Sequence, residues 1–119
     1  MIEDRLDMDA AMEHDIDALG LKYPRVLPQE VDALLKQVVY DVHYCPDTTT
    51  TVVTAILPIK HIKWTLCSEI MACVDPRNFD SELGRKYGIE KAKAKAKDEL
   101  WKLLGFKLAM EMTTEPFYN

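Results

Sequence analysis

The chain has 119 residues, a mass of 13.7 kDa and a formal net charge of −5 at pH 7. Hydrophobic residues make up 48% of it and charged residues 29%, which is ordinary for a globular protein and excludes wholesale disorder, a collagen-like repeat and a disulfide-dense scaffold. The length predicts a single compact domain with room for a small appendage.

The charge is distributed unevenly along the chain. Residues 1–20 carry seven acidic side chains and one arginine, for a net charge of −6, whereas residues 85–107 carry eight basic and three acidic side chains, for +5. Three explanations stay open. An acidic arm neutralises a basic face within one chain or between subunits, or the basic face binds a phosphate-bearing ligand, or both are ordinary solvated helix faces.

No apolar run approaches the roughly 20 residues that cross a bilayer, and the N-terminus is acidic where a secretory signal would be basic and then apolar. These features predict a cytoplasmic protein with no membrane partner. Cys67 and Cys73 lie six residues apart in one predicted strand and cannot pair with each other, so we expect reduced thiols.

Two helices are predicted in the first third of the chain. The first covers residues 2–19 and ends at Gly20; its apolar stripe is thin, so we expect it to need a partner surface. Residues 21–28 form a linker, and the second helix opens at Pro28. Its predicted apolar face consists of Val31, Leu34, Leu35, Val38 and Val39. We therefore divide the chain into an acidic helical extension, 1–20, and one domain, 24–119.

The middle of the chain is typical of strands. The pattern from Tyr40 to Tyr44 is ambiguous, and a loop follows it. β-Branched residues predict a strand from Thr50 to Leu57, stopped by Pro58. A second strand is predicted from Lys63 to Val74. Both of its faces are largely apolar, so we expect cover on both sides of the sheet, by helices on one and by a second layer or subunit on the other.

The longest predicted element is a helix that starts after a cluster of capping residues near Asp80 and ends at Gly105. Its expected buried side consists of Leu83, Tyr87, Leu100, Leu103 and Leu104. Alternating apolar residues then predict a final strand over 106–112. Together these elements predict an α+β fold, with a small antiparallel sheet packed against a long helix and additional N-terminal helices.

Catalytic and metal-binding patterns are not found. His43 and Cys45 have no second pair at ligand spacing, the four glycines form no phosphate loop, and no carboxylate pair stands in an apolar context. We predict no enzyme, no metal and no cofactor. Four lysines between residues 91 and 97 suggest nucleic acid, but a chain with a pI near 5.1 is repelled from a polyphosphate. A small anionic ligand fits better than a nucleic-acid polymer.

The segment from Ala72 to Arg85, with Trp101–Phe106, resembles a family of small bacteriophage and prophage proteins. That family typically reads Ser-Ala-Cys-Val, a proline, Asn-Phe-Asp with a Glu, Gly and Arg, a helix, and Trp-x-Leu-x-Gly-aromatic. The segment from Pro24 to Val31 is also similar, and the resemblance covers about residues 24–112. The family includes anti-Thoeris sponge proteins, which sequester the cyclic ADP-ribose-type signal of the bacterial Thoeris system. Some members capture cyclic oligonucleotides and assemble from dimers into hexamers.

The resemblance implies a phage counter-defence protein of the host bacterial cytoplasm. It would sequester a cyclic nucleotide immune signal without catalysis, as a homo-oligomer, either a dimer or a hexamer. The chain departs from the family at Lys60–Trp64, where an Asn-Gly-aromatic turn is usual, and in a longest helix about one turn longer. The alternative is a phage interaction or structural module that assembles or inhibits a host factor.

The ligand-binding residues implied by the resemblance follow one another along the chain. Phe79 would stack on a base, Asn78 and Asp80 would hydrogen-bond a base or ribose, and Arg85 would reach a phosphate. Lys91 and Lys95 are further ligand-binding candidates. Ordinary structural roles stay open for the same residues: Asn78 capping the helix, Phe79 packing against it, and solvated basic side chains.

Overall fold

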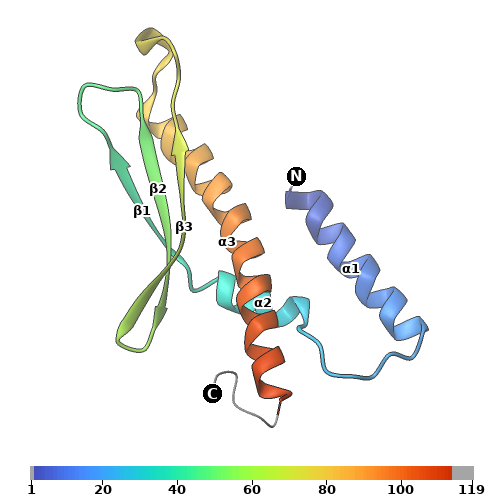
Figure 1. The fold of residues 1–119 in the computed structure, drawn as a ribbon. Coiled ribbons are helices and arrows are strands. Elements are labelled where there is room, and N and C mark those ends of the chain that lie inside the picture. Colours follow the sequence, from blue (N-terminus) through green and yellow to red (C-terminus); the bar gives the residue numbers. More distant parts are fainter. Residues whose placement is uncertain (1, 114–119) are drawn as a thin grey trace.

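The computed structural model describes residues 2–113, with side chains from residue 8 onward, and its fold is α+β as expected (Figure 1). The elements in chain order are α1 (Ile2–Ala18), α2 (Pro28–Leu35), β1 (Val39–Tyr44), β2 (Thr51–Ile59), β3 (Ile62–Met71), the short 3-10 helix η1 (Pro76–Asn78) and α3 (Ser81–Glu111). None of the helices within this range is both long enough and apolar enough to cross a membrane.

The three strands form an antiparallel sheet in the order β1-β2-β3. The central residue Val53 lies opposite Val42 of β1 and Glu69 of β3, and the β2–β3 register shifts at Ala55 and Ile56. A tight turn with Lys60 at φ 54° joins β2 to β3. Threonine and β-branched residues fill these strands because they fit a pleated, half-buried surface.

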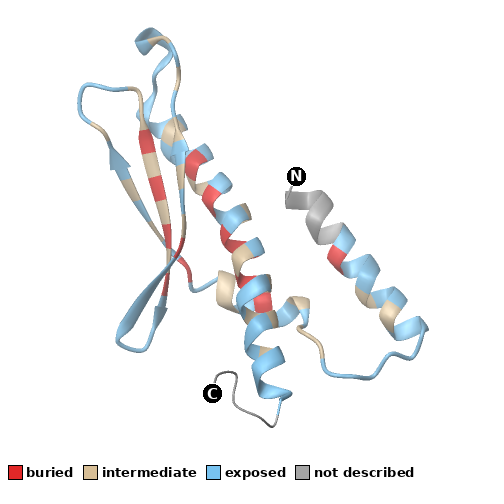
Figure 2. Ribbon diagram, viewed as in Figure 1, coloured by how far each residue is buried: buried red, intermediate tan, exposed pale blue. Residues whose placement is uncertain are grey.

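α3 crosses one face of the sheet and buries every second residue of β2, from Thr51 to Leu57 (Figure 2). The contact is close because α3 presents small residues at every fourth position, Gly84, Gly88, Ala92 and Ala96. A Cβ on Gly88 would lie 2.7 Å from Val53 Cγ2, so a larger residue would push the helix off the sheet. The core lies between β2 and α3, with Leu100 at its far end.

The predicted end of this helix at Gly105 is wrong, and so is the strand predicted over 106–112. α3 continues to Glu111, with a 2.8 Å ion pair between Lys107 and Glu111. The alternation of apolar residues there also fits a helix, because Lys, Leu, Ala, Met and Glu are strong helix formers. The buried side was also misplaced: Leu83 and Tyr87 are each 52% exposed.

Strand boundaries differ from the predictions for local reasons. α2 ends at Leu35, so Val39 starts β1 instead of extending a helix face. Pro58 does not end β2. Its missing N–H is tolerated because β1 pairs with β2 only as far as Ile56, which leaves that edge open at Pro58. β3 ends at Met71, short of the predicted Val74.

The second face of the sheet is open, since the described helices that pack on the sheet do so on the α3 side (Figure 1). Val39 is 55% exposed and Ile70 is 60% exposed. Thr54 and Ser68 hydrogen-bond to each other across this face, with 2.9 Å between their hydroxyl oxygens. We expected both faces of the sheet to be covered. The described residues of this chain cover one face.

Candidate ligand-binding site

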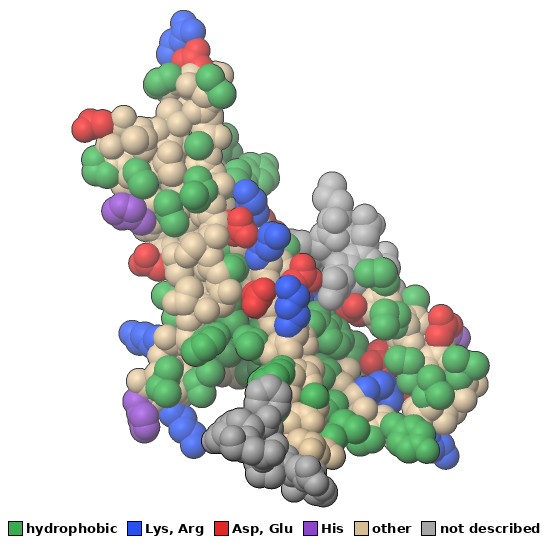
Figure 3. Space-filling model, viewed as in Figure 1, with side chains coloured by type: hydrophobic (Ala, Val, Ile, Leu, Met, Phe, Trp, Pro, Cys, Tyr) green, Lys and Arg blue, Asp and Glu red, His purple; other side chains and the backbone are tan. Residues whose placement is uncertain are grey.

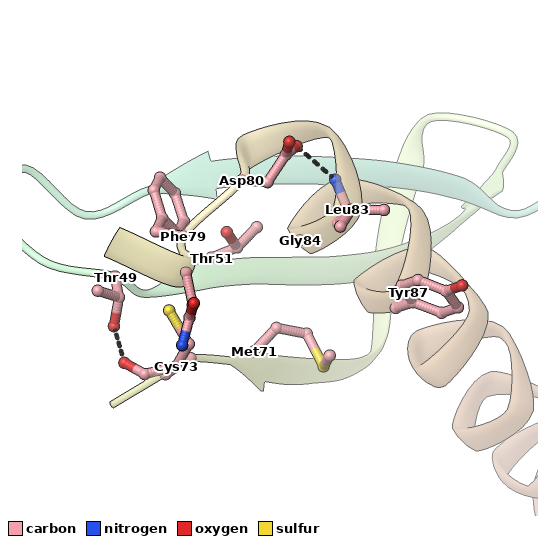
Figure 4. Close-up of a pocket in the computed structure, with 11 residues that line it drawn as sticks. Thr49, Thr51, Met71, Cys73, Phe79, Asp80, Leu83, Gly84 and Tyr87 are labelled. Atoms are coloured by element: carbon pink, nitrogen blue, oxygen red, sulfur yellow. Dashed lines mark hydrogen bonds between the residues drawn. The ribbon is translucent and has the colours of Figure 1, made fainter. Parts of the chain in front are cut away.

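A hollow of about 150 Å³ lies where β2 begins and β3 ends, under the first two turns of α3 (Figure 4). We call it the α3 hollow. It is lined by Thr49, Thr51, Met71, Ala72, Cys73, Asn78, Phe79, Asp80, Leu83, Gly84 and Tyr87. Because the lining comes from both strand ends, η1 and α3, the fold brings together residues up to 38 positions apart in the sequence.

The segment between β3 and α3 is shaped by its own hydrogen bonds. Asp75 accepts one from the Arg77 N–H at 2.9 Å and pairs with the Arg77 guanidinium at 2.6 Å. The guanidinium lowers the pKa of Asp75, and the carboxylate raises that of Arg77. The Thr49 hydroxyl donates to the Cys73 carbonyl at 2.5 Å. These contacts fix the path that carries Asn78 to Asp80 over the end of the sheet.

Asp80 caps the N-terminus of α3. Its Oδ1 accepts hydrogen bonds from the N–H groups of Glu82 at 2.9 Å and Leu83 at 3.1 Å. The sequence allows Asn78 as a possible cap of this helix, but Asp80 is the residue that caps it. A carboxylate already occupies the helix end that would otherwise attract an anion, and none of the residues lining the hollow is Lys or Arg. The α3 hollow therefore suits an uncharged, hydrogen-bonding group better than a phosphate.

Aromatic and apolar side chains form the rim. Phe79 is partly exposed, and Leu83 and Tyr87 are about half exposed. Phe79 and Tyr87 lie toward opposite ends of the hollow, with Met71 between them (Figure 4). The Lys86 ammonium lies 5.4 Å from the centre of the Tyr87 ring, within the range of a cation–π contact. The rim can thus stack on a planar ring.

The hollow contains three of the six residues implied by the family resemblance, Asn78, Phe79 and Asp80. Arg85, Lys91 and Lys95 are exposed residues of α3 and do not line it. The Lys91 ammonium donates a hydrogen bond to the Ile70 carbonyl at 3.2 Å and lies 3.7 Å from the Glu69 carboxylate. Both partners belong to β3, so the charge of Lys91 is paired with this strand.

Several lining residues were missed from the sequence. Thr49 lies in the loop expected after Tyr44, and Thr51 lies in the strand predicted from Thr50 to Leu57. Tyr87 was expected on the buried side of the long helix. Thr51 is fully buried beneath the hollow, and its hydroxyl has no hydrogen-bond partner within residues 2–113. No local pattern marks such residues, because the end of the sheet joins them to Phe79 only in the fold.

The comparison with known families gives a match to the model of the phage protein (N4 Gp49/phage Sf6 gene 66) family over residues 26–112. The chain belongs to this phage protein family. The match contains the whole sheet, the α3 hollow and α3, and it begins after α1. No curated protein and no solved structure matches the chain.

Membership of the phage protein family agrees with the predicted phage origin and with the extent of the resemblance, about residues 24–112. The described part of this phage protein has no cluster of three or more His, Cys, Asp or Glu residues that could hold a metal ion. The α3 hollow presents hydroxyl, amide, carboxylate and aromatic groups.

Proposed function

We propose that this phage protein binds and sequesters a cyclic nucleotide immune signal, of the cyclic ADP-ribose or cyclic oligonucleotide type, without catalysis. The observation that carries the proposal is the α3 hollow itself. It gathers Asn78, Phe79 and Asp80 at the start of α3, next to Tyr87. Phage membership supports a role inside an infected bacterium.

The charges of the hollow suggest how such a ligand would bind. A base or ribose would enter, with its ring against Phe79 and its polar edge toward Asn78 or Asp80. The phosphates would stay outside, because the Asp80 carboxylate repels them. Arg85 is exposed on α3 directly after the lining residue Gly84 and could balance their charge there.

The size of the hollow supports a homo-oligomer. Pockets for drug-sized ligands occupy about 300–1,000 Å³, whereas the α3 hollow in one chain has about 150 Å³. Leu83 and Tyr87 remain half exposed at its rim. A second copy that faces this rim would supply the missing wall and exclude water from the ligand, as tight binding requires.

Calorimetric titration of the full chain with cyclic ADP-ribose isomers and cyclic oligonucleotides tests the proposal. At least one compound should bind, and Phe79→Ala should weaken its binding by tenfold or more. Phe106→Ala is the matched control, since Phe106 is an exposed phenylalanine of α3 that does not line the hollow. The absence of binding by every compound would rule out sequestration of these signals.

A second candidate function is an interaction module that assembles with or inhibits a host factor. The open sheet face favours it, because Val39 and Ile70 expose apolar surface there. Affinity capture from host lysate, with the full chain and with a chain lacking residues 1–20, separates the two functions. A host protein captured stoichiometrically, together with no binding of any cyclic nucleotide, would favour the interaction module.

A further inference from the structure

α1 turns the carboxylates of Asp9 and Glu13 toward the rest of the molecule and leaves Met8 and Met12 exposed. Asp9 is 7% exposed, and Glu13 and Ile16 are partly buried. By contrast, Met8 and Met12 are more than half exposed and Leu19 is 74% exposed. Hydrophobic side chains are visible on the outer surface of this helix (Figure 3). An ordinary amphipathic helix would bury such apolar side chains and expose its carboxylates.

A buried charge cluster ties α1 to the body of the molecule. Lys97 of α3 is 5% exposed, and its ammonium lies 3.5 Å from Asp9 of α1 and 3.5 Å from Asp32 of α2. Lysine is almost never buried so deeply unless its charge is paired. The cluster therefore joins the three helices at one point, and α1 supplies one of the two carboxylates.

The linker after α1 is fastened to α1 itself. Arg25 donates two hydrogen bonds to Glu13, at 2.7 and 3.2 Å, and lies 3.6 Å from Asp17. The Glu13 carboxylate is the main cause of the raised pKa of the Arg25 guanidinium. α1 and its linker are thus held together as one piece, separate from the tie at Lys97.

Packing between α1 and α2 is incomplete. A hollow of about 380 Å³ lies between them, lined by Asp9, Ala10, Glu13, Pro28, Gln29 and Asp32. A dense apolar interface would leave no such space. Among the described side chains, the charge cluster is therefore the main tie between α1 and the helices it lies on, and its net contribution is small because the buried ions lose their hydration.

We propose that α1 is a strap that closes over α2 and α3 through the Asp9–Lys97–Asp32 cluster and opens together with its linker, as one piece. Opening returns Lys97 to water and exposes the inward side of α1, with Asp9 and Glu13, for other contacts. The strap lies outside the family match, so it adds a movable arm to the common domain. One acidic residue of segment 1–20, Asp9, and one basic residue of segment 85–107, Lys97, thus form the tie that holds the arm.

Hydrogen exchange of the full chain, read by mass spectrometry, tests the strap. A detached helix of this length is marginal in water, so opening exposes the α1 amides to exchange. Lys97→Met removes the cation that joins Asp9 to α3 and should speed exchange in α1 at least tenfold, with α3 unchanged. Lys97→Met combined with Asp9→Leu replaces the pair by apolar contact and should restore protection.

Lys93→Met is the matched control, because Lys93 is an exposed lysine one turn earlier on α3, and it should change nothing. Asp9→Asn provides a second route, since it removes the charge from the strap and leaves the core of α3 untouched. It too should speed exchange in α1. Unchanged protection of α1 in both Lys97→Met and Asp9→Asn would overturn the proposal, as would exchange of wild-type α1 at the rate of a free peptide.

Discussion

Gly84 of α3 packs directly against Thr51 of β2: a Cβ on Gly84 would lie 2.8 Å from the Thr51 hydroxyl oxygen. The same Cβ would lie 3.5 Å from the Thr51 Cβ, an ordinary contact distance. The hydroxyl alone therefore stands where a side chain on Gly84 would go. This contact sets how closely the first turns of α3 approach the sheet, and with it the depth of the α3 hollow.

Gly84→Ala should destabilise the protein. Overpacking costs about 1–3 kcal/mol, which exceeds the roughly 1 kcal/mol that alanine gains over glycine inside a helix. In a Thr51→Ala background the hydroxyl is gone, and Gly84→Ala should become neutral or stabilising. Urea unfolding of the four variants measures the coupling. Thr51→Val is the control, because its second methyl group fills the place of the hydroxyl and should keep the clash.

Asp80 has a capping role that can be separated from any role in ligand binding. Asp80→Ala removes the acceptor of the Glu82 and Leu83 N–H groups and should lower the free energy of unfolding by about 1 kcal/mol. Asp80→Ser keeps a capping oxygen and should retain most of that stability. Binding measured on the Asp80→Ser protein then reports on the carboxylate alone. Equal stability of all three proteins would contradict the capping role.

The sequence predicted the parts of the fold that depend on local pattern. The starts of α2 and α3 follow from Pro28 and from the capping residues near Asp80, and β2 follows from a run of β-branched residues; these patterns act within a few positions. The family resemblance, and no local pattern, implied three residues that line the α3 hollow, Asn78, Phe79 and Asp80. Thr49 and Thr51 were not predicted as site residues, because they reach the hollow only through strand pairing.

Tertiary contacts decided the rest. Lys97 looked like one of four similar lysines, yet it alone among them is buried, because α1 and α2 bring carboxylates to it. The small residues of α3, at positions 84, 88, 92 and 96, do not by themselves predict which face of the helix is buried. They form the buried face because β2 lies against them. The segment after Gly105 fits a strand and a helix equally well by alternation. Continuation of α3 decides between the two.

Gly105→Ala should stabilise the protein. Gly105 lies inside α3, and a Cβ there would meet no described atom within 4 Å beyond its chain neighbours and the nearby backbone of its own helix. Alanine therefore gains its helix propensity, up to about 1 kcal/mol, without a clash. Thermal unfolding should show a higher midpoint. A lower midpoint would indicate the left-handed conformation of a helix-ending glycine, which alanine adopts poorly.

Cys67 should be the slowest of the three cysteines to react with iodoacetamide. Burial raises the pKa of the Cys67 thiol, with a further contribution from the negative charges of Glu69 and Glu99. Its sulfur also lies 3.4 Å from the Ala92 carbonyl, to which it donates. The thiolate is the nucleophile, so a raised pKa leaves little reactive form near neutral pH, and the rate should increase as the pH rises.

Peptide mapping after timed alkylation gives the rate at each cysteine, with Cys45, in the loop after β1, as the comparison. Folding stability should also fall as the pH rises above the ordinary pKa of a thiol, because the unfolded chain releases the Cys67 proton first. In Cys67→Ala, folding stability should fall less as the pH rises, because this thiol is absent. Rapid alkylation of Cys67 at neutral pH in the folded protein would show that the thiol is not held between β3 and α3.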